Sequence, residues 1–255
     1  PVAAIARYWA HTRVRNADEA VADLDHLLAA EVLQPGEDAD TIGFHDLAHE
    51  YLLLHADALP ALHGQLLDAY RGLLDEPGQW WTLPIDEPYV WEHLIAHLGG
   101  AGDRGRLVVT ATDPAYQAKR IARDGPRAGE ADLAVAARLV PDEPTVAWWQ
   151  GWLARHGHLL DERFTPGSAL ARCAATMLAW LEADPTRPSS VRPDRLVPLL
   201  SRPYLAVHGG LTAAPGALVR VLAGHGYGVF ALAWSPDGSR LMTGGGADQH
   251  VRLWD

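Results

Sequence analysis

The sequence has 255 residues, of which 48% are hydrophobic, and its formal net charge is −11. No apolar run approaches the ~18 residues that a membrane-spanning helix needs, and no cluster of Lys and Arg could neutralise a row of phosphates. We therefore expect neither a membrane nor nucleic acid as a direct partner. Cys173 is the one cysteine and no basic-then-apolar leader opens the chain, which favours a cytoplasmic protein.

Two helical patterns and a turn-rich stretch open the chain. Residues 2–10 and 17–33 repeat apolar side chains at three- and four-residue steps, with Asn16 as a candidate N-cap and Glu19 as its capping-box partner. Residues 31–44 hold a Pro-Gly turn between two short apolar pieces, which predicts a hairpin. Two helices followed by a hairpin are typical of a winged helix, so residues 1–56 are interpreted as a winged-helix segment.

Helical periodicity then dominates residues 57–184, which we interpret as a helical arm domain. Gly and Pro residues interrupt this periodicity at intervals that suit pairs of helices. Seven tryptophans lie in or beside the predicted helices, and we expect them to be packing residues rather than a ligand cage. They are Trp80, Trp81, Trp91, Trp148, Trp149, Trp152 and Trp180.

The composition changes after the last arm helix. Six prolines lie between Pro185 and Pro215, which predicts a linker over residues 185–217. Residues 218–255 then contain four β-rich runs separated by turns, one of them Pro236-Asp237-Gly238.

A cluster of histidines follows the predicted hairpin and raises the question of a metal site. His45 and His49 are one helical turn apart, the pairing that HExxH enzymes use for zinc, and Asp46 stands at the position of the general base. A third ligand at His55 would require a glycine where Leu52 stands, so that the chain could turn back toward the metal. We therefore predict no metal site, and a zinc metallopeptidase that uses His45 and His49 is kept as an alternative.

The order helix, helix, hairpin, then Phe44-His45-Asp46 opening a helix resembles the winged-helix segment of the NB-ARC class of STAND ATPases. This resemblance implies that His45 is a nucleotide sensor whose imidazole N–H reaches the β-phosphate of bound ADP, a charge-assisted hydrogen bond. It also implies that Asp46 braces the start of the helix, where a carboxylate is favourable.

Residues 59–74, 80–102 and 202–225 look like the arm and linker of bacterial AP-ATPase-like signalling proteins fused to WD repeats. The chain contains no GxxxxGK[ST] loop to cradle phosphates, so we do not expect it to be an enzyme by itself. The resemblance implies that ADP or ATP binds to a nucleotide-binding domain of the parent protein, and that this domain is a partner of the present chain. We expect no cofactor in the chain itself.

Residues 219–255 resemble a WD repeat, with Gly224-His225 at the start, residues 235–238 as a turn, and Trp254-Asp255 at the end. The resemblance implies a hydrogen-bonded structural tetrad of His225, Asp248, Trp254 and a hydroxyl group. That hydroxyl either belongs to Thr243 or is lost within Gly244-Gly245-Gly246. A propeller needs about four to eight blades, so we expect the other blades to lie in the parent protein or to come from other chains.

The predicted fold is mainly α: a winged-helix remnant and a multi-helix arm domain, with a small C-terminal antiparallel β WD-repeat blade. The predicted function is that of a non-catalytic regulatory fragment of a STAND-type ATPase, which binds protein partners through the WD repeat. A plain helical adaptor or scaffold module is a further alternative.

Overall fold

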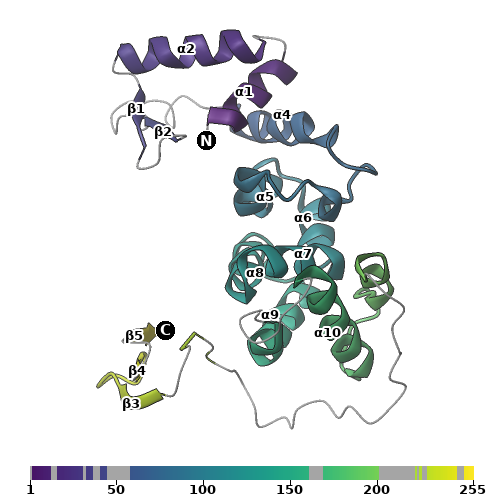
Figure 1. The fold of residues 1–255 in the computed structure, drawn as a ribbon. Coiled ribbons are helices and arrows are strands. Elements are labelled where there is room, and N and C mark those ends of the chain that lie inside the picture. The colour runs from purple at the N-terminus through teal and green to yellow at the C-terminus, as the bar shows by residue number, and fades with distance from the viewer. Residues whose placement is uncertain are drawn as a thin grey trace.

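The computed structural model describes residues 2–12, 16–30, 33–36, 41–44, 58–160, 169–200, 222, 224–225, 229–245 and 250–255. The fold is mainly α and carries a three-stranded antiparallel sheet near its C-terminal end (Figure 1). Among the residues described, no helix is long and apolar enough to cross a bilayer.

The chain begins with two helices and a short hairpin, α1 (Val2–His11), α2 (Ala17–Ala29), β1 (Leu33–Pro35) and β2 (Ile42–Phe44). Asn16 Oδ1 accepts a hydrogen bond of 2.9 Å from the Glu19 amide, and Glu19 Oε2 accepts one of 3.1 Å from the Asn16 amide. The predicted capping box is therefore confirmed. The antiparallel pairing of β1 with β2 likewise confirms the predicted hairpin.

The helical region follows, and proline defines where most of its helices begin. Proline stands in the first turn of α4, α5, α7, α8 and α9, where its missing N–H costs no intrahelical hydrogen bond. The elements are α4 (Leu59–Arg71), η1 (Trp80–Thr82), α5 (Pro88–Gly100), α6 (Arg104–Ala111), α7 (Pro114–Asp124), α8 (Pro126–Leu139), α9 (Pro144–His156), η2 (Gly157–Leu160), α10 (Ala169–Ala183) and η4 (Pro193–Leu199).

One hydrophobic core runs through this region from α4 to η4. Four of the predicted packing tryptophans, Trp80, Trp91, Trp149 and Trp152, are at most 3% exposed. The other three, Trp81, Trp148 and Trp180, are partly buried and pack against the same core. The interpretation of the tryptophans as packing residues is confirmed.

A buried polar network joins α7 to α8. Asp132 Oδ2 accepts hydrogen bonds from Tyr116 Oη at 2.7 Å and from Arg120 Nε at 3.0 Å. Arg120 also forms an ion pair with Asp124. Because each charged group has a partner, the network tolerates its burial and fixes how the two helices pack.

The proline-rich stretch differs from its expected character over residues 185–200. Within it, η4 packs against α10 and α7, and Val191 and Leu196 are fully buried. Short 3-10 turns need few backbone donors, so prolines interrupt them less than they would an α-helix. The packed helical region therefore extends to Leu200, and residues 201–217 of the expected linker lie outside the described residues.

Candidate functional site: the C-terminal blade and its contact with the helices

Three antiparallel strands, β3 (Val229–Trp234), β4 (Leu241–Gly245) and β5 (Val251–Trp254), form the C-terminal blade. Its register pairs Trp234 with Leu241 and Leu241 with Trp254. Trp234, Leu241 and Trp254 therefore carry their side chains on one face of the sheet. Because side chains alternate between the faces, the residues next to them along each strand carry theirs on the opposite face. The register therefore decides which residues meet on each face.

A tight turn joins β3 to β4. The Asp237 carboxylate accepts hydrogen bonds from the Ser235 hydroxyl and from both the amide and the hydroxyl of Ser239. These hydrogen bonds, with that from Ser235 the strongest influence, lower the pKa of Asp237 to about 2. Gly238 has a φ of 70°, a left-handed conformation that suits glycine. The turn therefore fixes the spacing of the two strands.

Three of the four predicted tetrad residues meet in the structure. Thr243 Oγ1 lies 2.7 Å from His225 Nε2 and accepts a hydrogen bond of 2.8 Å from Trp254 Nε1. Thr243 is 6% exposed, so its hydroxyl satisfies the indole N–H away from solvent. The structure thus places the Thr243 hydroxyl, rather than one of the neighbouring glycines, beside His225 and Trp254. Asp248 lies outside the described residues.

Large apolar side chains remain exposed on both faces of the blade. Leu232 and Trp234, on the face that carries Thr243, are 64% and 63% exposed. Leu253 and Val251, on the opposite face, are 59% and 70% exposed. An apolar surface of this kind marks a place where another protein surface packs.

The blade touches the helical region at the start of α8, a contact that sequence reasoning missed. The Arg127 guanidinium lies 5.0 Å from the centroid of the Trp254 ring, within the range of a cation–π interaction. A Cβ atom at Gly224 would come within 3.2 Å of the Trp254 ring and 3.3 Å of the Arg127 side chain. The glycine before His225 therefore permits this close approach.

A second feature missed from the sequence is a pair of histidines between α4 and α5. Nδ1 of His63 lies 2.7 Å from Nδ1 of His97, and Nε2 of His97 lies 3.1 Å from the Tyr89 hydroxyl. Burial, and then the nearby His63 and His93, lowers the pKa of His97 to about 4. One proton between the two Nδ1 atoms stabilises the contact, whereas two would oppose each other.

The sequence also predicts a nucleotide-sensing site, with a zinc site as the alternative. His45 and Asp46, proposed to sense nucleotide, lie outside the described residues, as does His49 of the alternative zinc site. Within the described part of the chain, no group of three or more His, Cys, Asp or Glu residues is arranged to hold a metal ion.

Comparison with protein families agrees with the geometry of the blade. Residues 216–255 match the family model described as WD domain, G-beta repeat. No curated protein matches the chain. The C-terminal segment is thus a WD repeat, a module that serves protein–protein interaction.

Proposed function

We propose that this chain is a non-catalytic regulatory segment of a STAND-type signal-transduction ATPase of bacterial type, and that it links a nucleotide switch to a WD-repeat sensor. The observation that carries the proposal is the WD blade, which shares one chain with a closely packed helical region and contacts it. Such an arrangement suits a receptor in which one part binds a partner and another transmits the event.

The exposed blade residues support protein partners. Apolar side chains such as Trp234 and Val251 lie on opposite faces, so a single partner surface covers only one of them. Neighbouring blades in the parent protein would cover both faces, and ligand proteins would then bind to the assembled propeller. The chain therefore contributes one element of a larger recognition surface.

The Arg127–Trp254 contact gives the helices a means to respond to the blade. A change in blade position alters a contact at the N-terminal end of α8, and α8 packs against α5, α6, α7 and α9. A signal at the blade would thereby reach the helices that lead toward α4 and the N-terminal unit. This route becomes allosteric only if the nucleotide site responds to it.

The nucleotide end of the proposal depends on the family resemblance of Phe44-His45-Asp46. ADP would bind in the nucleotide-binding domain of the parent protein and accept a hydrogen bond from His45, whereas Asp46 would hold the start of its helix. The present chain would need no cofactor of its own, and the protein would act in the cytoplasm.

The decisive experiment compares ADP binding by the full-length parent protein with that by its His45→Ala and His55→Ala variants, measured by calorimetry. Loss of a hydrogen bond to a charged group costs about 1.5–3 kcal/mol, so His45→Ala should weaken ADP binding about ten- to hundredfold. His55→Ala, a control from the same segment, should bind ADP as the parent does. Equal ADP affinity of all three proteins would contradict the sensor role of His45. It would instead support the alternative that the chain is a helical adaptor without contact to the nucleotide.

Zinc analysis separates the proposal from the metallopeptidase alternative. We expect less than stoichiometric zinc after dialysis of the purified chain. One tightly held zinc per chain that is lost in both His45→Ala and His49→Ala would instead support a metal-dependent enzyme.

A further inference from the structure

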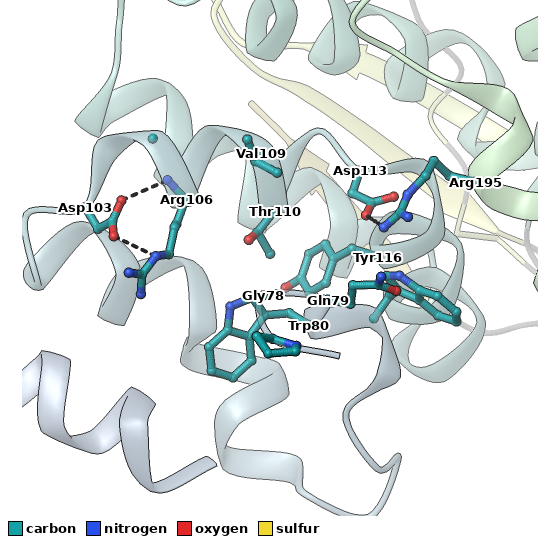
Figure 2. A pocket seen from close by; sticks show the side chains of 13 residues that line it. Gly78, Gln79, Trp80, Asp103, Arg106, Val109, Thr110, Asp113, Tyr116 and Arg195 are labelled. Carbon is teal, nitrogen blue, oxygen red and sulfur yellow. Dashed lines mark hydrogen bonds and ion pairs between the residues drawn. The ribbon is translucent and has the colours of Figure 1, made fainter. Parts of the chain in front are cut away.

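The helical region contains a cavity that the proposed function does not use. Its volume is about 590 Å³, and it is lined by residues 77–81 before and within η1, by α6, by the start of α7 and by Arg195 of η4 (Figure 2). A volume of this size suits a small molecule. The cavity thus joins three stretches that are distant in the sequence.

Two aspartates hold the polar rim of the cavity in place. Asp103 accepts a hydrogen bond of 2.9 Å from the Arg106 amide and forms an ion pair of 3.0 Å with Arg106 Nε. Asp113 accepts a hydrogen bond of 2.9 Å from the Ala115 amide and forms an ion pair of 2.9 Å with Arg195. Both carboxylates therefore cap a helix and orient an arginine before any ligand arrives.

The other side of the cavity is aromatic and apolar. Trp80, Trp81 and Tyr116 line it together with Val109, which is 67% exposed although it is a large aliphatic residue. Figure 2 shows the Trp80 ring below Thr110 and Tyr116. Trp80 and Tyr116 are nearly fully buried, so a flat apolar group would contact mainly the partly exposed Trp81 and Val109.

The buried side-chain atoms that lack partners at this cavity, among the residues described, are two hydrogen-bond donors. Trp80 Nε1 and Trp81 Nε1 are buried and have no hydrogen-bond partner within the described part of the chain, and Trp80 is only 3% exposed. Arg106 pairs with Asp103 through Nε, and its terminal amino groups form no hydrogen bond or ion pair with any described residue. A side chain 52% exposed at this rim can turn its remaining donors toward a ligand.

The geometry points to a binding site for a small aromatic carboxylate. The ring would lie against Trp81 and Val109, beside the edge of Trp80, and the carboxylate would accept hydrogen bonds from Arg106 at the rim. An acceptor suits the site because the aspartates already have donors, whereas the buried indole N–H groups of Trp80 and Trp81 have no acceptor within the described part of the chain. The indole N–H groups of Trp80 and Trp81 are further donors at the same cavity.

The test uses phenylacetate, with phenethylamine as a probe that has the same ring but a cationic donor. Binding is followed by the ¹H–¹⁵N signals of the tryptophan indoles in the whole chain, and the Trp80→Phe spectrum assigns the Trp80 signal. We expect phenylacetate to shift the Trp80 and Trp81 signals with a millimolar dissociation constant, and phenethylamine to bind at least tenfold more weakly.

Two variants locate the carboxylate. Arg106→Gln should weaken phenylacetate binding at least tenfold, whereas Arg104→Gln, which changes an exposed arginine of α6 outside the cavity lining, should bind within twofold of the unchanged chain. Both side chains are exposed, so both variants should fold, and their thermal unfolding checks this. The inference is overturned by unshifted indole signals at about 10 mM phenylacetate, by equal binding of the two probes, or by equal weakening in the two variants.

Discussion

The helical region and the C-terminal blade differ in how far their large apolar side chains are exposed. Between α4 and η4 the largest side chains, such as Trp91, Trp149 and Trp152, are fully buried within one core. In the blade, Trp234 and Leu253 remain more than half exposed. The helical region therefore closes on itself, whereas the blade is completed only by another surface.

The two regions also differ in what fixes their geometry. The helices are joined by a buried ionic network around Asp132, and the blade by a hydroxyl shared between His225 and Trp254. The first arrangement resists local opening because its removal leaves a buried charge. The second consists of two hydrogen bonds to one hydroxyl group, and its removal leaves the Trp254 N–H without an acceptor.

The largest effect should come from Asp132→Ala. Its removal leaves the Arg120 guanidinium, whose side chain is 7% exposed, without its buried partner, and it also removes the acceptor of the Tyr116 hydroxyl. We expect the free energy of unfolding to fall by about 3–5 kcal/mol in urea titrations followed by circular dichroism. The exposed Asp194→Ala, which breaks a pair with Arg192 on the surface, is the control and should leave the midpoint unchanged. Similar midpoints for the two variants would mean that the network does not hold α7 to α8.

The second prediction concerns pH and the joint between α4 and α5. Because burial lowers the pKa of His97 to about 4 from an ordinary 6.5, the unfolded chain binds a proton that the folded chain does not between these values. Stability should therefore fall as pH decreases from about 6.5 to about 4, by roughly 2–3 kcal/mol. His63, whose pKa burial also lowers, faces the same ring and adds to this trend.

Urea titrations at several pH values measure this dependence. In His97→Gln the decrease should become distinctly smaller, since the side chain that excludes the proton is gone. The exposed His26→Gln on α2 should keep the full decrease. An unchanged profile in His97→Gln would assign the acid sensitivity to other groups.

The third prediction concerns the Thr243 hydroxyl and its contribution to the stability of the blade. Thr243→Val keeps the shape of the side chain but leaves the Trp254 N–H without its acceptor, at a cost of about 1–2 kcal/mol. Hydrogen exchange of the β4 and β5 amides should accelerate about five- to thirtyfold, with little change in α7 and α8. Thr243→Ser retains the hydroxyl and should exchange nearly as slowly as the unchanged chain. Equal acceleration in both variants would exclude the hydroxyl as the cause.

Much of this architecture follows from local sequence signals. The capping box at Asn16, the hairpin of β1 and β2 and the burial of Trp80 and Trp91 were predictable because each depends on neighbouring residues or on side-chain hydrophobicity. The match of residues 216–255 to the WD repeat likewise follows from a local pattern.

What escaped prediction depends on residues far apart in the chain. The contact of His63 with His97 and that of Arg127 with Trp254 require packing that no spacing rule provides. The cavity brings Trp80 to Arg195 for the same reason. The high proline content predicted a linker where η4 forms, because composition alone does not show that Leu196 packs into the hydrophobic core.

The smallest expected effect concerns the joint between the two regions. Arg127→Ala removes the guanidinium from the Trp254 ring, an interaction worth about 0.5–1 kcal/mol at a partly exposed site, so the ratio of docked to undocked blade should fall about two- to fivefold. Single-molecule energy transfer between dyes on Arg138→Cys and Ser239→Cys measures this ratio. Arg127→Lys should retain part of the docking and Arg104→Ala all of it. If the distance distribution is the same in all three, the blade and the helices are not coupled through Trp254, and a relay from sensor to switch must take another path.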